Sequence, residues 1–105
     1  MKKINQRLIK KIANKIAREF QPEKIILFGS RAYGEPDNGS DLDFLIIKNS
    51  PLPRHKRAIE IQRSFYNYFI PMDIVVYTRE EVEKYKDVKG SFIHTVMKKG
   101  KVLYG

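Results

Sequence analysis

The sequence predicts an α/β (α+β) fold in which helices pack on a small β-sheet. Short apolar runs that suit buried strands alternate with amphipathic stretches that suit helices. Glycine and proline separate these stretches. The chain has 105 residues, of which 42% are hydrophobic and 31% charged. These values fit a single small domain over residues 1–105 that can bury a core.

The first element is expected to be an amphipathic helix that ends near Phe20. Ile4, Leu8, Ile12 and Ile16 recur every four residues, and Lys and Arg fill most of the positions between them. One face of such a helix is apolar and can pack on a sheet, while the other stays in solvent.

Two strands are expected around a glycine-serine turn. The first covers about Lys24 to Phe28, and a short helical turn follows from Ser30 to Gly34. The loop Glu35 to Ser40 carries proline and an Asn-Gly pair, which are turn signals. The second strand covers about Asp41 to Ile47.

The second half of the chain should add two more elements after a proline-rich break. A helix is predicted from about Arg54 to Tyr68, and a third strand from about Ile70 to Tyr77. The apolar face of that helix would consist of Ala58, Ile61, Phe65, Tyr68 and Phe69.

The C-terminal segment should contain two short helices and a tail. Thr78 and Glu81 have the spacing of a capping box, so a helix should begin there. The last helix should run from about Val88 to Lys99 and stop at the following glycine. Residues 102–104 are then either an edge strand or a docked tail.

The formal net charge of +9, from 21 basic and 12 acidic residues, indicates an acidic partner. A nucleotide, a nucleic acid and an acidic protein would all fit, and a merely soluble basic surface is the alternative. No apolar stretch reaches the ~20 residues of a membrane span. The N-terminus lacks signal-peptide features, and cysteine is absent. A cytoplasmic protein is expected, without disulfides or thiolate metal sites.

The main functional signal joins Gly29-Ser30, which follows one strand, to Asp41 and Asp43, which open the next. Alternate strand residues share a face, so the two carboxylates project together and repel each other unless a cation or proton intervenes. A glycine-serine turn can present backbone N–H groups to a phosphate. The combination predicts phosphoryl or nucleotidyl transfer, although each motif alone is more often a simple turn or a solvated strand end.

Asp73 is the predicted third carboxylate, because it lies in an otherwise apolar strand. If this strand lies beside the second one, Asp73 completes a face of hard oxygen ligands that suits Mg²⁺ or Mn²⁺. Two ions ~3.5–4 Å apart could activate the attacking oxygen and stabilise the leaving pyrophosphate. The alternative is that Asp73 is an exposed residue at a strand start.

These motifs resemble those of the nucleotidyltransferase superfamily with the DNA polymerase β-like fold. The family pattern is Gly-Ser, ten residues, then Asp-x-Asp, and residues 29–43 match its spacing. The finer pattern Gly-Ser-Arg-Ala-x-Gly, five residues, Ser-Asp-x-Asp is similar to that of the minimal nucleotidyltransferases, or MNT proteins. The C-terminal residues 97–104 are also similar to that group. The resemblance spans nearly the whole chain and implies a small mixed sheet.

The resemblance implies roles by position. Asp41, Asp43 and Asp73 would be catalytic metal ligands, and Asp73 would also help to deprotonate the acceptor hydroxyl. Gly29 and Ser30 would hold the phosphates of the donor ATP. Arg31 would assist them, or else it is a surface arginine.

The same resemblance implies a protein partner. Some MNT proteins transfer AMP from ATP to a tyrosine of a helical HEPN toxin, and so act as antitoxins. The chain has only 28 residues after Tyr77, so we expect another chain to hold the acceptor. The net charge and the C-terminal residues Phe92, Ile93, Val96 and Leu103 are expected to contribute to docking.

The leading prediction is therefore a Mg²⁺-dependent nucleotidyltransferase that moves AMP to a hydroxyl of a HEPN-family partner. One alternative is a catalytically weak antitoxin that only binds and masks its partner. Another is a basic nucleic-acid-binding module, whose binding would depend steeply on salt.

Overall fold

The computed structural model describes residues 4–34 and 41–105. In chain order the described elements are α1 (Gln6–Phe20), β1 (Lys24–Phe28), α2 (Ser30–Tyr33), β2 (Leu42–Ile47), α3 (Arg54–Arg57), α4 (Ile59–Arg63), β3 (Met72–Tyr77), α5 (Arg79–Tyr85), α6 (Phe92–Lys99) and β4 (Lys101–Tyr104).

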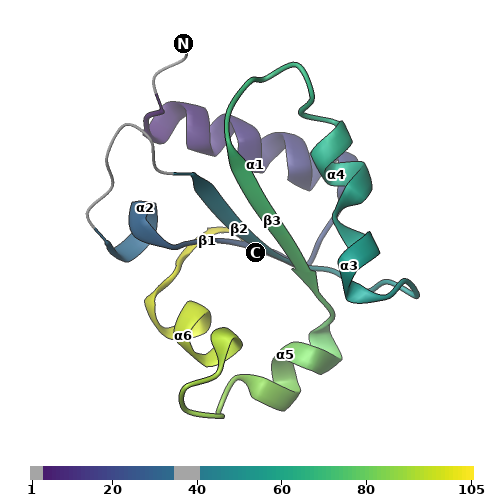
Figure 1. Cartoon of the computed structure of the whole chain (residues 1–105), viewed down its shortest axis with the longest axis vertical. Helices are drawn as coiled ribbons and strands as arrows, with labels where there is room; N and C mark the ends of the chain where they lie inside the picture. The colour runs from purple at the N-terminus through teal and green to yellow at the C-terminus, as the bar shows by residue number, and fades with distance from the viewer. Residues whose placement is uncertain (1–3, 35–40) are drawn as a thin grey trace.

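The four strands form one mixed sheet in the order β3-β2-β1-β4. Strand β1 is antiparallel to both β2 and β4, whereas β2 and β3 are parallel. Helices α1 and α4 lie on one side of the sheet, and α5 and α6 lie on the other (Figure 1). The predicted fold class, a small mixed sheet covered by helices, is confirmed.

Local sequence signals fix the ends of several helices. The side chain of Asn5 accepts a hydrogen bond of 2.9 Å from the Leu8 N–H and caps α1. The predicted capping box is present at α5, where Thr78 and Glu81 exchange hydrogen bonds of 2.8 and 3.2 Å. The side chain of Ser91 accepts a hydrogen bond of 3.1 Å from the His94 N–H and caps α6.

The larger core lies between the sheet and helices α1 and α4. The α1 residues predicted to face the sheet are buried or half-buried, and they pack on the side chains of alternate strand residues. The buried members of this core are Ile9, Ile12, Ala13, Ile16, Ile25, Leu27, Leu42, Phe44, Ile46, Ile61, Phe65, Ile74 and Val76.

The smaller core lies on the opposite face, under α5 and α6. Its buried members are Ile26, Leu45, Ile47, Val82, Ile93 and Val96. Two residues that were expected to dock a partner, Ile93 and Val96, are only 1% exposed. That expectation was wrong, because both side chains fill this core, whereas Phe92 beside them is 40% exposed.

The long helix predicted from Arg54 to Tyr68 was wrong in its extent. The structure has α3 and α4 instead, separated at Ala58, and turns replace the last helical residues. Residues 54–57 are all basic and offer no apolar side chain to the core. Phe69, assigned to the apolar face of that helix, is 87% exposed and has a positive φ of 54°.

Other predicted boundaries shift by a few residues. The second strand begins at Leu42, the third at Met72, and the last helix at Phe92, after the Ser91 cap. The C-terminal tail forms the edge strand β4. The predicted loop Glu35 to Ser40 lies outside the described residues. Within the described ranges, no helix is both long and apolar enough to cross a membrane.

Candidate active site

The parallel pairing of β2 with β3 brings two predicted site residues side by side. Asp43 and Asp73 are partners in the register of these strands, and neighbouring strands lie about 4.8 Å apart. Asp41 lies two residues before Asp43, just ahead of β2, and Asp43 and Asp73 share one face of the sheet. This is the face covered further along by α5 and α6. Asp41 and Asp73 are exposed, and Asp43 is half-buried.

The carboxylates interact electrostatically. Partial burial raises the pKa of Asp43 above its ordinary value of 3.8, and the negative charges of Asp73 and then Asp41 raise it further. A bound cation or proton would therefore relieve the repulsion at Asp43.

The turn between β1 and α2 approaches Asp43 directly. Phe28, the last residue of β1, is the register partner of Asp43, and Gly29 follows it with φ 77° and ψ −162°. A Cβ at position 29 would overlap Asp43 Oδ2 and lie 3.1 Å from its Cγ. Only glycine lets the turn lie this close to the carboxylate. Ser30 then begins α2, so the predicted phosphate-binding residues and the acidic cluster adjoin each other.

The next residues of the motif lie along α2. Arg31 is half-buried. Tyr33 is 42% exposed, and the Nζ of Lys99 lies 5.9 Å from the centre of its ring. Lys99 therefore adds a positive charge from α6 beside the motif, a proximity that the sequence did not predict.

The chemistry of the acidic cluster fits a divalent cation. Its oxygen donors are the hard ligands that Mg²⁺ prefers, and a cation would offset the repulsion that Asp73 and Asp41 exert on Asp43. As the side chains stand, the described residues include no group of three acidic or histidine side chains gathered closely enough to hold a metal ion. Binding would therefore require the exposed carboxylates to rotate toward Asp43.

Sequence reasoning missed a second feature of this face, an aromatic cavity near the acidic cluster. Tyr77 lies four residues after Asp73 on β3 and shares its face. Phe92 on α6 contacts Tyr77 and also Phe28, the neighbour of Gly29. The alternation of Asp73 and Tyr77 on β3 was visible in the sequence, but the position of Phe92 was not.

Comparisons with known proteins identify the class. Residues 9–103 match the family model "Nucleotidyltransferase domain", so the chain belongs to this family. Its structure is similar to the crystal structure of a protein from Sulfolobus solfataricus that is assigned as a nucleotidyltransferase. The TM-score is 0.59 at 27% identity, over 77% of this chain and 73% of that one. A search of curated proteins found no match.

Proposed function

We propose that this nucleotidyltransferase-family chain transfers AMP from ATP, with Mg²⁺ or Mn²⁺, to a hydroxyl of a partner protein. The partner would be a HEPN-family toxin with an acceptor tyrosine, so the chain would act as its antitoxin. The observation that carries the enzymatic proposal is the pairing of Asp43 with Asp73 beside the Gly29 turn.

Asp41, Asp43 and Asp73 would hold the cations in this proposal. Bound divalent ions would neutralise charge on the triphosphate and on the leaving pyrophosphate. Gly29 and Ser30 would lie against the donor phosphates, with Arg31 assisting from the first turn of α2. The negative charges of Asp73 and Asp41, which help to raise the pKa of Asp43, would also favour a bound cation there.

The reaction would proceed by in-line displacement at the α-phosphorus. The tyrosine oxygen of the partner forms a bond to the α-phosphorus, and the bond from that phosphorus to the α–β bridging oxygen breaks. Pyrophosphate leaves with the electron pair. Asp73, the more exposed of the paired carboxylates, would accept the tyrosine proton. This requires the acceptor to approach from solvent, where Asp73 is accessible.

Surface charge supports a partner that is at least partly acidic. The chain carries a net charge of +9, and large apolar side chains near its C-terminus are exposed. They include Val102 at 56% and Tyr104 at 42%. Such a surface offers both electrostatic attraction and apolar area to a protein partner.

The direct test is intact-mass spectrometry of the chain mixed with its HEPN-like partner, ATP and Mg²⁺. We expect a mass gain of one or more AMP units on the partner and none with a chelator. A tight complex without an adduct would favour the masking antitoxin. Absence of a complex, with strong and salt-sensitive RNA binding, would favour the nucleic-acid module.

Asp73→Ala separates the proposed role of this residue from donor binding. We expect the transfer rate to fall much more than ATP affinity, because Gly29-Ser30 and the other carboxylates would still hold the donor. A normal transfer rate in this variant would contradict the role of Asp73. Calorimetry with a non-hydrolysable ATP analogue gives the affinity, and single-turnover mass spectrometry gives the rate.

A further inference from the structure

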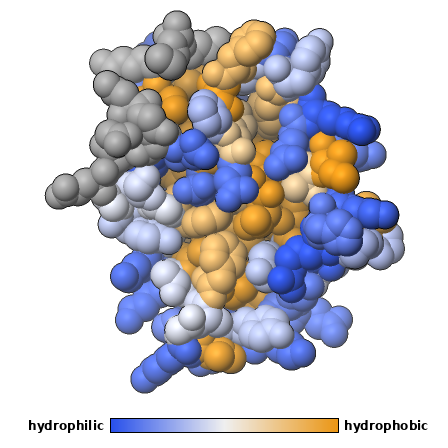
Figure 2. Space-filling view, in the orientation of Figure 1, coloured by the Kyte–Doolittle hydropathy of each residue, from blue (hydrophilic) through white to orange (hydrophobic). Residues whose placement is uncertain are grey.

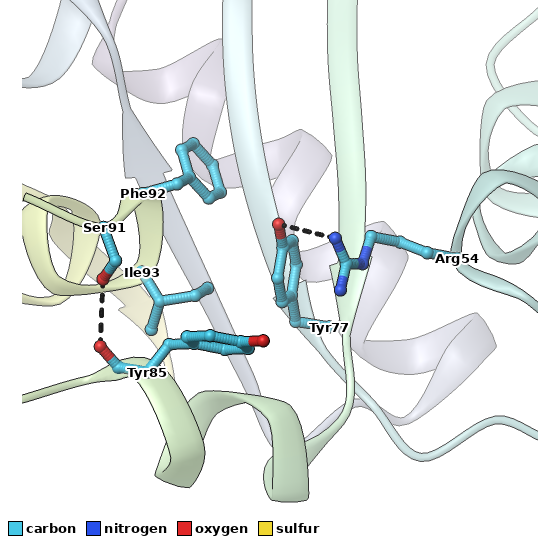
Figure 3. A pocket seen from close by; sticks show the side chains of 6 residues that line it. All are labelled: Arg54, Tyr77, Tyr85, Ser91, Phe92 and Ile93. Carbon is cyan, nitrogen blue, oxygen red and sulfur yellow. Dashed lines mark hydrogen bonds between the residues drawn. The ribbon is translucent and has the colours of Figure 1, made fainter. Parts of the chain in front are cut away.

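A small cavity lies on the same side of the sheet as the acidic cluster. Its volume is about 200 Å³, and its lining residues are Arg54, Tyr77, Tyr85, Ser91, Phe92 and Ile93. They come from α3, β3, α5 and α6 and from the residue that caps α6. In Figure 3 the rings of Phe92, Tyr77 and Tyr85 lie around this cavity, and Arg54 approaches Tyr77 from the side opposite Phe92.

The cavity walls are held in place by their own contacts. The guanidinium of Arg54 stacks 4.2 Å from the centre of the Tyr77 ring, donates to the Tyr77 hydroxyl over 3.2 Å, and pairs with Glu81 at 3.3 Å. The Ser91 hydroxyl donates to the backbone carbonyl of Tyr85 over 3.0 Å (Figure 3). The rings are therefore positioned before any ligand arrives, which lowers the entropic cost of binding.

An apolar path connects the cavity to the acidic cluster. Phe28, the register partner of Asp43, makes an edge-to-face contact with Phe92, with ring centres 5.2 Å apart. The Phe92 ring in turn lies 5.7 Å from that of Tyr77. Along β3, Tyr77 is ~13 Å from Asp73, and their side chains share a face. Figure 2 shows hydrophobic residues exposed over β3, between hydrophilic ones.

We infer that this cavity binds the purine base of the donor nucleotide. The inference rests on the proposed function, since the donor phosphates would lie at the acidic cluster. The ~13 Å between Asp73 and Tyr77 along β3 is of the order of the span of a nucleotide from phosphate to base. A flat base would stack on the aromatic rings. The Tyr77 hydroxyl accepts from Arg54 and can donate its own proton to a base nitrogen.

Size and exposure favour a base over a larger occupant. Pockets that enclose a whole drug-sized ligand measure roughly 300–1,000 Å³, so this cavity suits a single flat ring system. Phe92 is 40% exposed although it is a large apolar residue. Stacking gains more from the larger purine ring system than from a pyrimidine, so the cavity predicts a preference for ATP and GTP over CTP and UTP.

The test is calorimetric titration of the full chain with ATP, GTP, CTP, UTP and inorganic tripolyphosphate, each with Mn²⁺. We expect the purine nucleotides to bind about tenfold more tightly than the others, the order of one stacking contact. Tyr77→Leu, which keeps an apolar side chain, should bring purine affinity to the pyrimidine level and leave tripolyphosphate unchanged. Tyr66→Leu is the matched control, because Tyr66 is 81% exposed and does not line the cavity.

The outcomes separate this inference from the proposed function. Equal, Mn²⁺-dependent affinity for all four nucleotides would overturn the base site and leave the proposed function standing. If Tyr77→Leu loses as much affinity for tripolyphosphate as for ATP, that result would also overturn the base site and leave the proposed function standing. Failure of every nucleotide to bind would overturn both. The wild-type nucleotide series decides the question even if Tyr77→Leu does not fold, and Phe92→Leu provides a second variant.

Discussion

The two faces of the sheet differ in how completely they are covered. On the α1 and α4 face, the β2 side chains of Leu42, Phe44 and Ile46 are all inaccessible to solvent. On the other face the same strand carries Asp43, which is half-buried, and α5 and α6 cover only the part beyond it. On β2, the first face is therefore covered along the whole strand, whereas the second is covered over Leu45 and Ile47 and accessible at Asp43. The residues proposed to act lie where helical cover is incomplete.

The largest expected effect is a loss of stability on the face covered by α1 and α4. Phe44→Ala should destabilise the fold by about 3–5 kcal/mol, because a fully buried ring is lost and the surrounding core can collapse only partly. Urea denaturation measures this. Phe92→Ala is the comparison on the face covered by α5 and α6. It should reduce the free energy of unfolding by less than half as much, since Phe92 is already 40% exposed. Similar costs would mean that the two faces do not differ as described.

Asp43→Asn, on the other face of the sheet, should lower activity and not stability. We expect transfer to fall about 10²–10³-fold or more, because a ligand of the charged centre is lost. Stability at pH 7 should be unchanged or higher. Burial, Asp73 and Asp41 raise the pKa of Asp43 in the folded state. Protonation of Asp43 therefore stabilises the fold. This stabilisation is fully present below pH 3.8, the ordinary pKa, and is lost as the pH rises through the raised pKa of the folded state.

The measurements for Asp43→Asn are single-turnover transfer and thermal unfolding at several pH values. Any stability advantage of the variant should be present at pH 7 and disappear below pH 3.8. Asp87→Asn, a change at an exposed carboxylate outside the cluster, is the control. A variant with wild-type turnover would show that Asp43 is not a required ligand.

Gly29→Ala tests the contact between the turn and the cluster. The new Cβ would overlap Asp43 Oδ2, and the backbone conformation at φ 77° and ψ −162° suits glycine alone. We expect a loss of about 1–3 kcal/mol in the free energy of unfolding, together with loss of transfer. Gly90→Ala is the control, because Gly90 has φ 85° but no neighbour within 4 Å of the added carbon. Equal retention of activity in both variants would count against the phosphate-binding turn.

The smallest effect concerns the ion pairs that join α3 to α5. Burial alone would raise the pKa of Glu81, but hydrogen bonds from Arg57, the Thr78 N–H and Arg54 lower it to about 2. Because the folded pKa is lowered, the stabilisation is present above pH 4.5 and lost as the pH falls toward 2. Glu81→Gln should cost about 1 kcal/mol at pH 7, after allowance for solvent screening.

That cost of Glu81→Gln should fade in chemical denaturation at pH 2. The control is Glu83→Gln, since Glu83 pairs with Lys86 on the exposed side of the same region and should have no measurable effect. A cost for Glu81→Gln that is the same at pH 2 and pH 7 would mean that packing, and not charge, anchors α5.

Local patterns in the sequence were sufficient for most elements. The four-residue apolar repeat specified α1, the Thr78 and Glu81 pair specified the start of α5, and short apolar runs located three strands. The second helix was misjudged in its extent. Arg57, the last residue of α3, makes contacts with Leu52, Val76 and Glu81 that fix α3 against other parts of the fold. Such long-range contacts leave no periodic signal along the chain.

The sequence by itself predicted that Asp41 and Asp43 share a face, because strand geometry repeats every two residues. It also placed Gly29 and Ser30 at the end of the preceding strand. Only the tertiary structure decided that β3 pairs in parallel with β2, so that Asp73 lies beside Asp43. It also decided that Phe92, distant in sequence, packs between Phe28 and Tyr77. Strand order and helix packing depend on the energy of the whole core, which no single segment encodes.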